Sequence, residues 1–164
     1  MYTSGHTMPT PFVTCHYMNK FINPTKLVEV KYCNLPASMS FKEFNKKHRM
    51  PDLKTINITG DIRAMQKKDL SVVFKLWNKQ QEKYKFRYKV SQEELMQYLL
   101  PKADVVWTYV IENMVDGKVQ VTDFFSMHRL GQSCTSEGCK HKVMYSGFLY
   151  YYALTVNTFA DIVK

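Results

Sequence analysis

Four side chains that could bind a metal ion fall close together late in the sequence, and they are His128, Cys134, Cys139 and His141. Imidazole nitrogen and thiolate sulfur are ligands that zinc accepts in proteins. Paired zinc ligands usually follow a C-x₂₋₄-C spacing, and the gaps between these four residues follow no standard pattern. We therefore interpret the stretch LGQSCTSEGCKH as a polar surface loop between two strands, and we expect no metal site.

Cys15 and His16 are the types of residue that form a thiolate and its general base. Neighbouring residues of a strand point to opposite faces, so this pair cannot share a proton if the segment is extended. The six glycines are scattered along the chain, which excludes the glycine series of a P-loop or a dinucleotide-binding turn. We expect no cofactor-binding site, and we expect free thiols at the four cysteines.

Cap residues and side-chain periodicity predict the helices that position these groups. Asn23 and Pro24 suit the cap and the first position of a helix, because the Asn side chain can accept an orphan amide and proline lacks one. Ser91 and Glu94 form the capping box of a later helix. Three- and four-residue steps place one stripe on a single helix face, made of Leu70, Val73, Phe74, Trp77, Gln81 and Tyr84. The predicted helices span residues 24–30, 41–49, 70–84, 91–99 and 158–163.

Residues with high β propensity predict a mostly antiparallel sheet. The predicted strands span residues 12–21, 105–111, 119–128 and 143–154. Asp116 and Gly117 favour a hairpin turn between the second and third of these strands. Residues 53–60 lack a helical period and are interpreted as a surface connection. The order of elements predicts a mixed α/β fold whose sheet is incomplete.

Length and charge bound the class of protein. A chain of 164 residues has the usual size of one domain, and no apolar run is long enough for a membrane-spanning helix. The start of the chain lacks the pattern of a signal peptide, which predicts a soluble, cytoplasmic protein. The formal charge of +9 favours an anionic partner, which could be a nucleic acid, a membrane surface or a phosphate-bearing ligand.

Six short motifs carry a resemblance that covers nearly the whole chain. They are YTSG at 2–5, MPTPFVTCHY at 8–17, NPTKLVEVKY at 23–32, LLPKADVV at 99–106, VTDFFS at 121–126 and FLYYYA at 148–153. In this order they resemble the C-terminal, peptide-binding half of the N-myristoyltransferases (glycylpeptide N-tetradecanoyltransferases). The resemblance implies half of an acyl-CoA N-acyltransferase fold of the GNAT-like type, with a mixed, mostly antiparallel sheet flanked by helices and incomplete at both ends.

The resemblance also implies a set of substrate-binding residues. They are Thr3, Gly5, Tyr17, Asn19, Tyr32 and Leu149. Thr3 and Gly5 would lie near the attacking glycine amine, and the others would line the groove for the following peptide residues. Asn19 and Lys20 stand where the family usually has His and Arg, so a neutral amide replaces a titratable imidazole. No complete catalytic set is implied, and Thr3 is the residue expected nearest to the amine.

Two family motifs are absent from the sequence, the EINFLC type of the acyl-CoA half and KFGxGDG near the family's C-terminus. We therefore expect residues 1–164 to form a single C-terminal-type domain that lacks the acyl-CoA half and the final segment. Such a chain would be inactive alone and would not bind myristoyl-CoA, the family's acyl donor. Its expected partners are peptides that begin with glycine, and a complementary acyl-CoA-binding half would be a second partner.

Two other classes of function stay open at this point. A non-catalytic peptide-binding or interaction module would keep the groove without the chemistry. A basic nucleic-acid-binding protein would use the lysine-rich helices between Lys42 and Lys89 and the aromatic run from Tyr145 to Tyr152. Lysine rows opposite an apolar stripe are normally a solvated face, so we do not expect a nucleic-acid partner.

Overall fold

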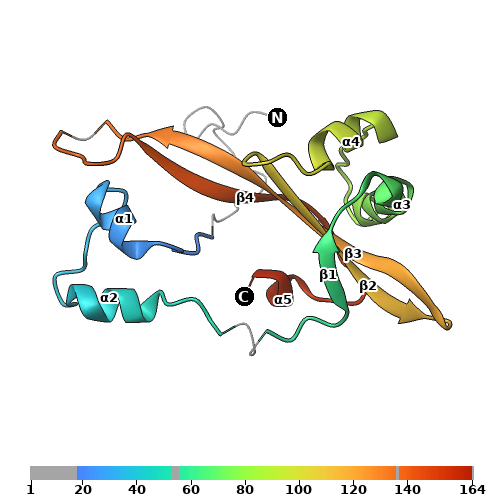
Figure 1. Ribbon diagram of the computed structural model, residues 1–164, viewed down its shortest axis with the longest axis horizontal. Coiled ribbons are helices and arrows are strands. Elements are labelled where there is room, and N and C mark those ends of the chain that lie inside the picture. Colours follow the sequence, from blue (N-terminus) through green and yellow to red (C-terminus); the bar gives the residue numbers. More distant parts are fainter. Residues whose placement is uncertain (1–17, 53–55, 136, 164) are drawn as a thin grey trace. The chain divides into compact units, whose positions relative to one another are not determined.

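The computed structural model describes residues 18–52, 56–135 and 137–163 of the chain. The chain divides into two compact units, residues 1–50 and residues 51–164, and each is described by itself (Figure 1). Most of the regular structure belongs to the second unit, which holds a four-stranded antiparallel sheet. The mixed α/β class that the sequence predicts is confirmed.

The first unit contains the helices α1 (Pro24–Glu29) and α2 (Phe41–Lys47). Asn23 caps α1, because its side-chain oxygen accepts a hydrogen bond from the Lys26 amide at 3.0 Å. A capping box formed by Ser40 and Glu43, which sequence reasoning missed, starts α2. Of the strand predicted for residues 12–21, residues 18–21 are not extended in a sheet, and the rest lies outside the described residues.

The sheet of the second unit has the strand order β1-β2-β3-β4, and all neighbouring strands are antiparallel. Its strands are β1 (Asp61–Ala64), β2 (Val106–Val115), β3 (Lys118–Ser133) and β4 (Val143–Ala153). Asp116 and Gly117 form the predicted turn between β2 and β3, and both have positive φ, as the tight hairpin turn requires. The strand β1 is a correction, because the sequence predicted none between residue 21 and residue 105.

The helices α3 (Leu70–Gln81) and α4 (Gln92–Leu99) cover one face of this sheet, with the short 3₁₀ helix η2 (Lys67–Asp69) before them (Figure 1). The predicted capping box of Ser91 and Glu94 starts α4. The core between helices and sheet is built from buried apolar residues of both layers. They are Met65, Leu70, Val73, Trp77, Leu95, Leu99, Val110, Phe124, Tyr151 and Ala153.

The stripe predicted along the third helix is right at its start and wrong at its end. α3 stops at Gln81, so Tyr84 lies in the following turn and is 45% exposed. Gln80, not Gln81, is the buried glutamine. Tyr84 therefore leaves the helical period on which the prediction depended.

The segment after β4 folds back onto the sheet and ends in α5 (Phe159–Val163), close to the helix predicted for residues 158–163. The carboxylate of Asp123 on β3 holds this segment. One of its oxygens accepts three consecutive backbone amides, from Thr155, Val156 and Asn157, at 2.6, 3.0 and 3.3 Å. A fully buried carboxylate is stable only when it is bonded in this way.

Candidate functional site

The sheet of the second unit has two chemically different faces because side chains alternate along each strand. Val110, Phe124 and Tyr151 point to the side that α3 and α4 cover. Their strand neighbours Tyr109 and Phe125 therefore point to the opposite side, which we call the open face. Figure 1 shows α3 and α4 on one side of the sheet and α5 on the other.

The open face is lined by large apolar side chains that are neither buried nor fully exposed. They are Trp107, Tyr109, Phe125, Met127, Leu149 and Tyr152. The rings of Tyr109 and Phe125 stack across the two strands with their centroids 5.5 Å apart. Such a band of half-covered aromatic and aliphatic groups is the usual lining of a ligand surface, or of a contact with another protein segment.

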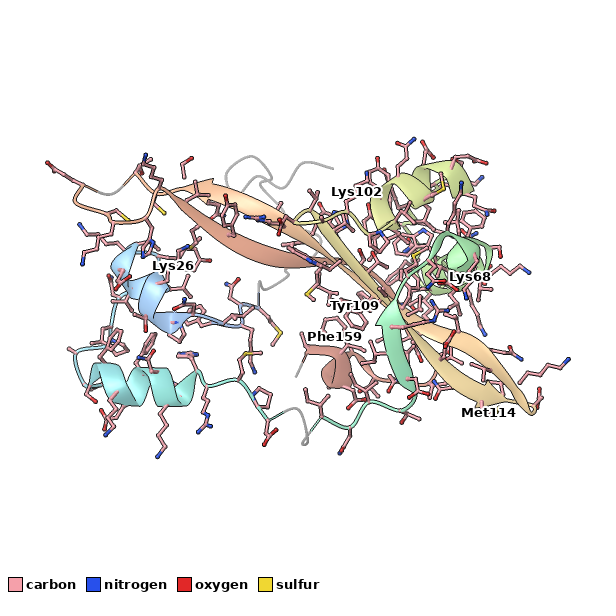
Figure 2. The ribbon with its side chains drawn as sticks, in the orientation of Figure 1. Lys26, Lys68, Lys102, Tyr109, Met114 and Phe159 are labelled. Atoms are coloured by element: carbon pink, nitrogen blue, oxygen red, sulfur yellow. The ribbon has the colours of Figure 1, made fainter. Side chains whose placement is uncertain are left out.

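One end of the open face is covered by the chain itself. Phe159, at the start of α5, contacts the ring of Tyr152 with centroids 5.1 Å apart. Figure 2 labels Phe159 on α5 and Tyr109 on the sheet. Ile111 and Asp123, on the same face and at this end, are fully buried. The half-exposed part of the face is therefore the part toward Trp107 and the middle of β4.

A β-bulge decides which residues of the aromatic strand reach the open face. The register between β3 and β4 shifts at Ser126 and Met127, so Tyr151 pairs with Ser126 while Leu149 pairs with Met127. Leu149 therefore shares the open face with Met127. Tyr150 is the extra residue of the bulge, and both it and Tyr151 contact the imidazole ring of His128.

His128 is a partly buried histidine on β3. Its Nε2 atom is buried and has no hydrogen-bond partner among the residues that the structure describes. Burial, with a smaller contribution from the positive charge of Lys102, lowers the pKa of His128 below its usual range. Because no donor or acceptor in the described ranges bonds this nitrogen, we interpret the imidazole, which lies against two tyrosine rings, as a packing group.

The strongest charged cluster joins β1 to the helical layer. The Arg63 guanidinium donates to both carboxylate oxygens of Asp69 at 2.6 and 2.8 Å, and to one Glu112 oxygen at 2.6 and 2.9 Å. Hydrogen bonds from Arg63, offset in part by burial, hold the pKa of Asp69 below its usual range. One guanidinium is shared by two carboxylates that it bonds directly, so we interpret this hydrogen-bonded cluster as structural.

The predicted site residues do not lie in one part of the chain. Asn19 is exposed in the first unit, before α1, and Tyr32, just after α1, is 48% exposed. Leu149 lies on the open face of the second unit. Thr3, Gly5 and Tyr17 lie outside the described residues. Sequence reasoning missed Trp107, Tyr109, Phe125 and Met127, although alternation along the predicted hairpin could have placed them on one face.

The four candidate metal ligands lie in the second half of β3 and in the connection between β3 and β4. His128 is within β3, whereas Cys134 follows the end of that strand. The Cys134 amide bonds the Lys142 carbonyl at 3.0 Å, and the Cys139 thiol donates to the His141 carbonyl at 3.2 Å. Over the described ranges, no three His, Cys, Asp or Glu side chains are placed to hold a metal ion together.

The antiparallel sheet and its helical layer make the second unit an α/β domain, and the comparison with solved structures gives its class. Among solved structures it is similar to the Saccharomyces cerevisiae N-myristoyltransferase, solved with bound myristoyl-CoA and inhibitors, with a TM-score of 0.67 and 29% sequence identity. That match covers 80% of this chain and 30% of the yeast chain. A second structure of the yeast enzyme with bound myristoyl-CoA gives the same TM-score at 28% identity.

The particular family follows from the sequence comparison. The profile of the myristoyl-CoA:protein N-myristoyltransferase C-terminal domain matches residues 29–164, across the boundary between the two units, and the chain belongs to this family. The chain is 35% identical over 153 residues to the probable glycylpeptide N-tetradecanoyltransferase of Caenorhabditis elegans, covering 92% of this chain. It is 31% identical over 164 residues to glycylpeptide N-tetradecanoyltransferase 2 of Bos taurus, covering 100% of this chain. In both comparisons the chain spans 32% of the relative's length.

Proposed function

We propose that this chain is the peptide-binding part of a glycylpeptide N-tetradecanoyltransferase and that it binds peptides beginning with glycine. The observation that carries the proposal is the family match over residues 29–164. The names of the relatives describe transfer of a tetradecanoyl group to a glycyl peptide. The chain spans about a third of these relatives, so the proposal assigns it one role in that reaction.

The geometry of the second unit supports this role. A peptide in an extended conformation needs an apolar wall with shallow pockets for alternate side chains. The open face offers stacked rings at Tyr109 and Phe125, and the aliphatic side chains of Met127 and Leu149 beside them. We propose that Leu149 contacts the bound peptide from this wall.

The remaining proposed contacts come from the start of the chain. We propose that Thr3 and Gly5 lie near the peptide's terminal amine, and that Tyr17, Asn19 and Tyr32 line the groove for its later residues. The side-chain amide of Asn19 can both donate and accept, so it would suit a neutral polar peptide residue. In this proposal residues 1–164 act as one domain.

We further propose that this chain leaves myristoyl-CoA to a complementary acyl-CoA-binding half and shows no turnover alone. Cys33 and Cys139 are free thiols, which fits a reducing compartment such as the cytoplasm. No helix of the described chain is long and apolar enough to cross a membrane.

The experiment that tests this function is a titration of the whole chain with a fluorescent octapeptide that begins with glycine. The control is the same peptide with an acetylated amine. Saturable binding of the free-amine peptide, at least about tenfold tighter than binding of the control, is the expected result. Equal or absent binding would refute the proposal. Steady myristoyl transfer by this chain alone would refute the claim that it lacks turnover.

A further inference from the structure

The connection between α3 and α4 has an unusual composition. From Lys83 to Lys89 the sequence is KYKFRYK, in which basic and aromatic residues alternate without exception. Four of its seven residues are basic, and Glu82 just before it is the one acidic residue between Asn78 and Val90. Packing against the core does not account for this composition, because Lys and Arg side chains are almost never buried.

The aromatic residues of this loop are exposed to very different degrees. Phe86 is 96% exposed, Tyr88 57% and Tyr84 45%. A phenylalanine ring that leaves water on binding stabilises the complex, whereas the same ring in solvent contributes nothing to folding. Among the described residues, Phe86 is therefore the large apolar side chain most available to a partner.

Both ends of the loop are anchored to the helical layer. The Gln81 side chain accepts the Tyr88 amide at 3.2 Å, and the Gln80 side chain accepts the Lys83 ammonium at 2.7 Å. Gln80 also donates to the Tyr84 hydroxyl at 3.4 Å. These hydrogen bonds hold both ends of the loop to the end of α3, and Phe86 lies between the two anchored ends.

We propose that the loop from Lys83 to Lys89 is a docking surface for an anionic lipid bilayer, in which Phe86 enters the interfacial region and the basic side chains meet acidic headgroups. Clusters of Lys and Arg with interspersed aromatic residues bind acidic leaflets through headgroup attraction and shallow burial of the rings. Tyr84 and Tyr88 suit the headgroup level, because their rings are apolar and their hydroxyls are polar.

A single-stranded nucleic acid is the other polyanion that such a composition could attract. Successive bases would need several free ring faces in a row. Here Tyr84 is held by Gln80 and half covered, and the Tyr88 backbone is fixed by Gln81, which leaves Phe86 as the fully available ring. One protruding apolar ring among lysines fits a membrane interface better than a stacking platform.

A depression of about 710 Å³ borders the loop. The acidic residue next to the loop, Glu82, lines this depression. Arg87, Tyr88 and Lys89 line it from the loop, and Glu82 lines it from the end of α3 together with Asn78 and Gln81. Glu82 and the last carbonyls of α3 disfavour an anion within the depression itself. Headgroup contact is therefore assigned to the projecting side of the loop, not to the depression.

The test measures co-sedimentation of the 164-residue chain with vesicles of 70% phosphatidylcholine and 30% phosphatidylserine, and with vesicles of phosphatidylcholine alone. We expect binding to the acidic vesicles, at least about tenfold weaker binding to the neutral ones, and loss of binding as salt rises. Equal binding to both vesicles, or binding to neither, would overturn the proposal.

Matched variants separate this loop from the overall charge. The loop variant replaces Lys83, Lys85, Arg87 and Lys89 by Gln, and the control variant replaces the exposed Lys67, Lys68, Lys75 and Lys118 by Gln. The loop variant should lose at least about tenfold in vesicle affinity and the control less than about threefold. Equal losses would show a diffuse charge effect and overturn the assignment.

Phe86→Ser tests the apolar contact. The side chain touches solvent, so the variant should fold normally and should bind acidic vesicles about threefold to tenfold more weakly. Unchanged vesicle binding by this variant would refute the role of Phe86. Tighter binding of the wild-type chain to an oligothymidine than to the acidic vesicles, lost in the loop variant, would assign the loop to nucleic acid instead.

Discussion

Asp123 and Asn157 are bonded to each other in the interior, with the Asn157 side-chain amide donating to the Asp123 carboxylate at 3.1 Å. Asp123 is fully buried and Asn157 is 8% exposed. Asn157 also accepts the Thr59 amide at 2.8 Å and donates to the Thr59 carbonyl at 3.0 Å. This pair therefore ties β3, the segment that leads to α5, and the chain before β1 to one point.

We predict that Asp123→Asn destabilises the fold by about 3 kcal/mol, because an amide nitrogen would face donors that the carboxylate accepts. The matched control is Asp116→Asn, the same chemical change in the exposed hairpin turn, where Asn tolerates positive φ. Urea unfolding followed by circular dichroism measures both. A loss from Asp123→Asn no larger than that of the control would contradict the role of this carboxylate.

Gly60 stands at the entry to β1 with a φ of +104°. An added Cβ would lie 2.5 Å from the Glu112 carbonyl oxygen and 2.7 Å from the Asn113 side-chain oxygen. We predict that Gly60→Ala lowers the free energy of unfolding by about 2 kcal/mol or more. Gly117→Ala is the control, because Gly117 also has positive φ but open space around its Cβ position. Equal losses in the two variants would mean that backbone strain alone, without the clash, sets the cost.

His128 gives the fold a dependence on mildly acidic pH. Burial lowers the pKa of His128 in the folded chain. In the unfolded chain its pKa has the ordinary value of about 6.5, so the unfolded chain binds the proton more readily. The contribution of the neutral His128 side chain to the free energy of unfolding is therefore fully present above about pH 6.5. This contribution is lost as the pH drops toward the folded pKa. We predict that His128→Phe reduces this fall between pH 7 and pH 5, measured by urea unfolding. An imidazole NMR titration with a midpoint above 6.5 would contradict the prediction.

Asp69 also makes the stability of the fold depend on pH, at a lower pH than His128 does. Its folded pKa lies below the ordinary value of about 3.9, so its contribution is present above that value and is lost as the pH falls through the folded pKa. We predict that Asp69→Asn costs about 2 kcal/mol at pH 7 and flattens the acid side of the stability curve. Asp61→Asn, an exposed change on β1, is the control. Parallel curves for Asp69→Asn and the wild-type chain would refute this.

Features that depend on local chemistry were predictable from the sequence. Asn23 and Ser91 cap their helices through hydrogen bonds to residues three positions away, and both predictions are confirmed. The hairpin at Asp116 and Gly117 follows from backbone preference alone. The strand β1 was missed because it is short and because Arg63, its half-buried residue, is charged. Its charge is matched only by groups that the tertiary fold brings near.

The candidate site was predictable only where it depends on the alternation of side chains along a strand. Alternation along β2 and β3 predicts two faces, but the bulge at Ser126 and Met127 has no sequence signature. Which of the aromatic residues from Phe148 to Tyr152 share a face therefore follows only from the register of β4. Leu149 entered the prediction through the family resemblance, and its place on the open face is a finding of the structure.

The most direct test of the proposed function compares peptide affinity in two variants of β4. Leu149→Ala removes a half-buried side chain from the open face, and Ser146→Ala removes an exposed hydroxyl from the same strand. With the glycine-starting octapeptide, we predict a dissociation constant about fivefold to tenfold higher for Leu149→Ala, equivalent to about 1 kcal/mol of lost apolar contact, and an unchanged one for Ser146→Ala. Unchanged affinity in a folded Leu149→Ala chain would contradict the claim that the open face binds the peptide.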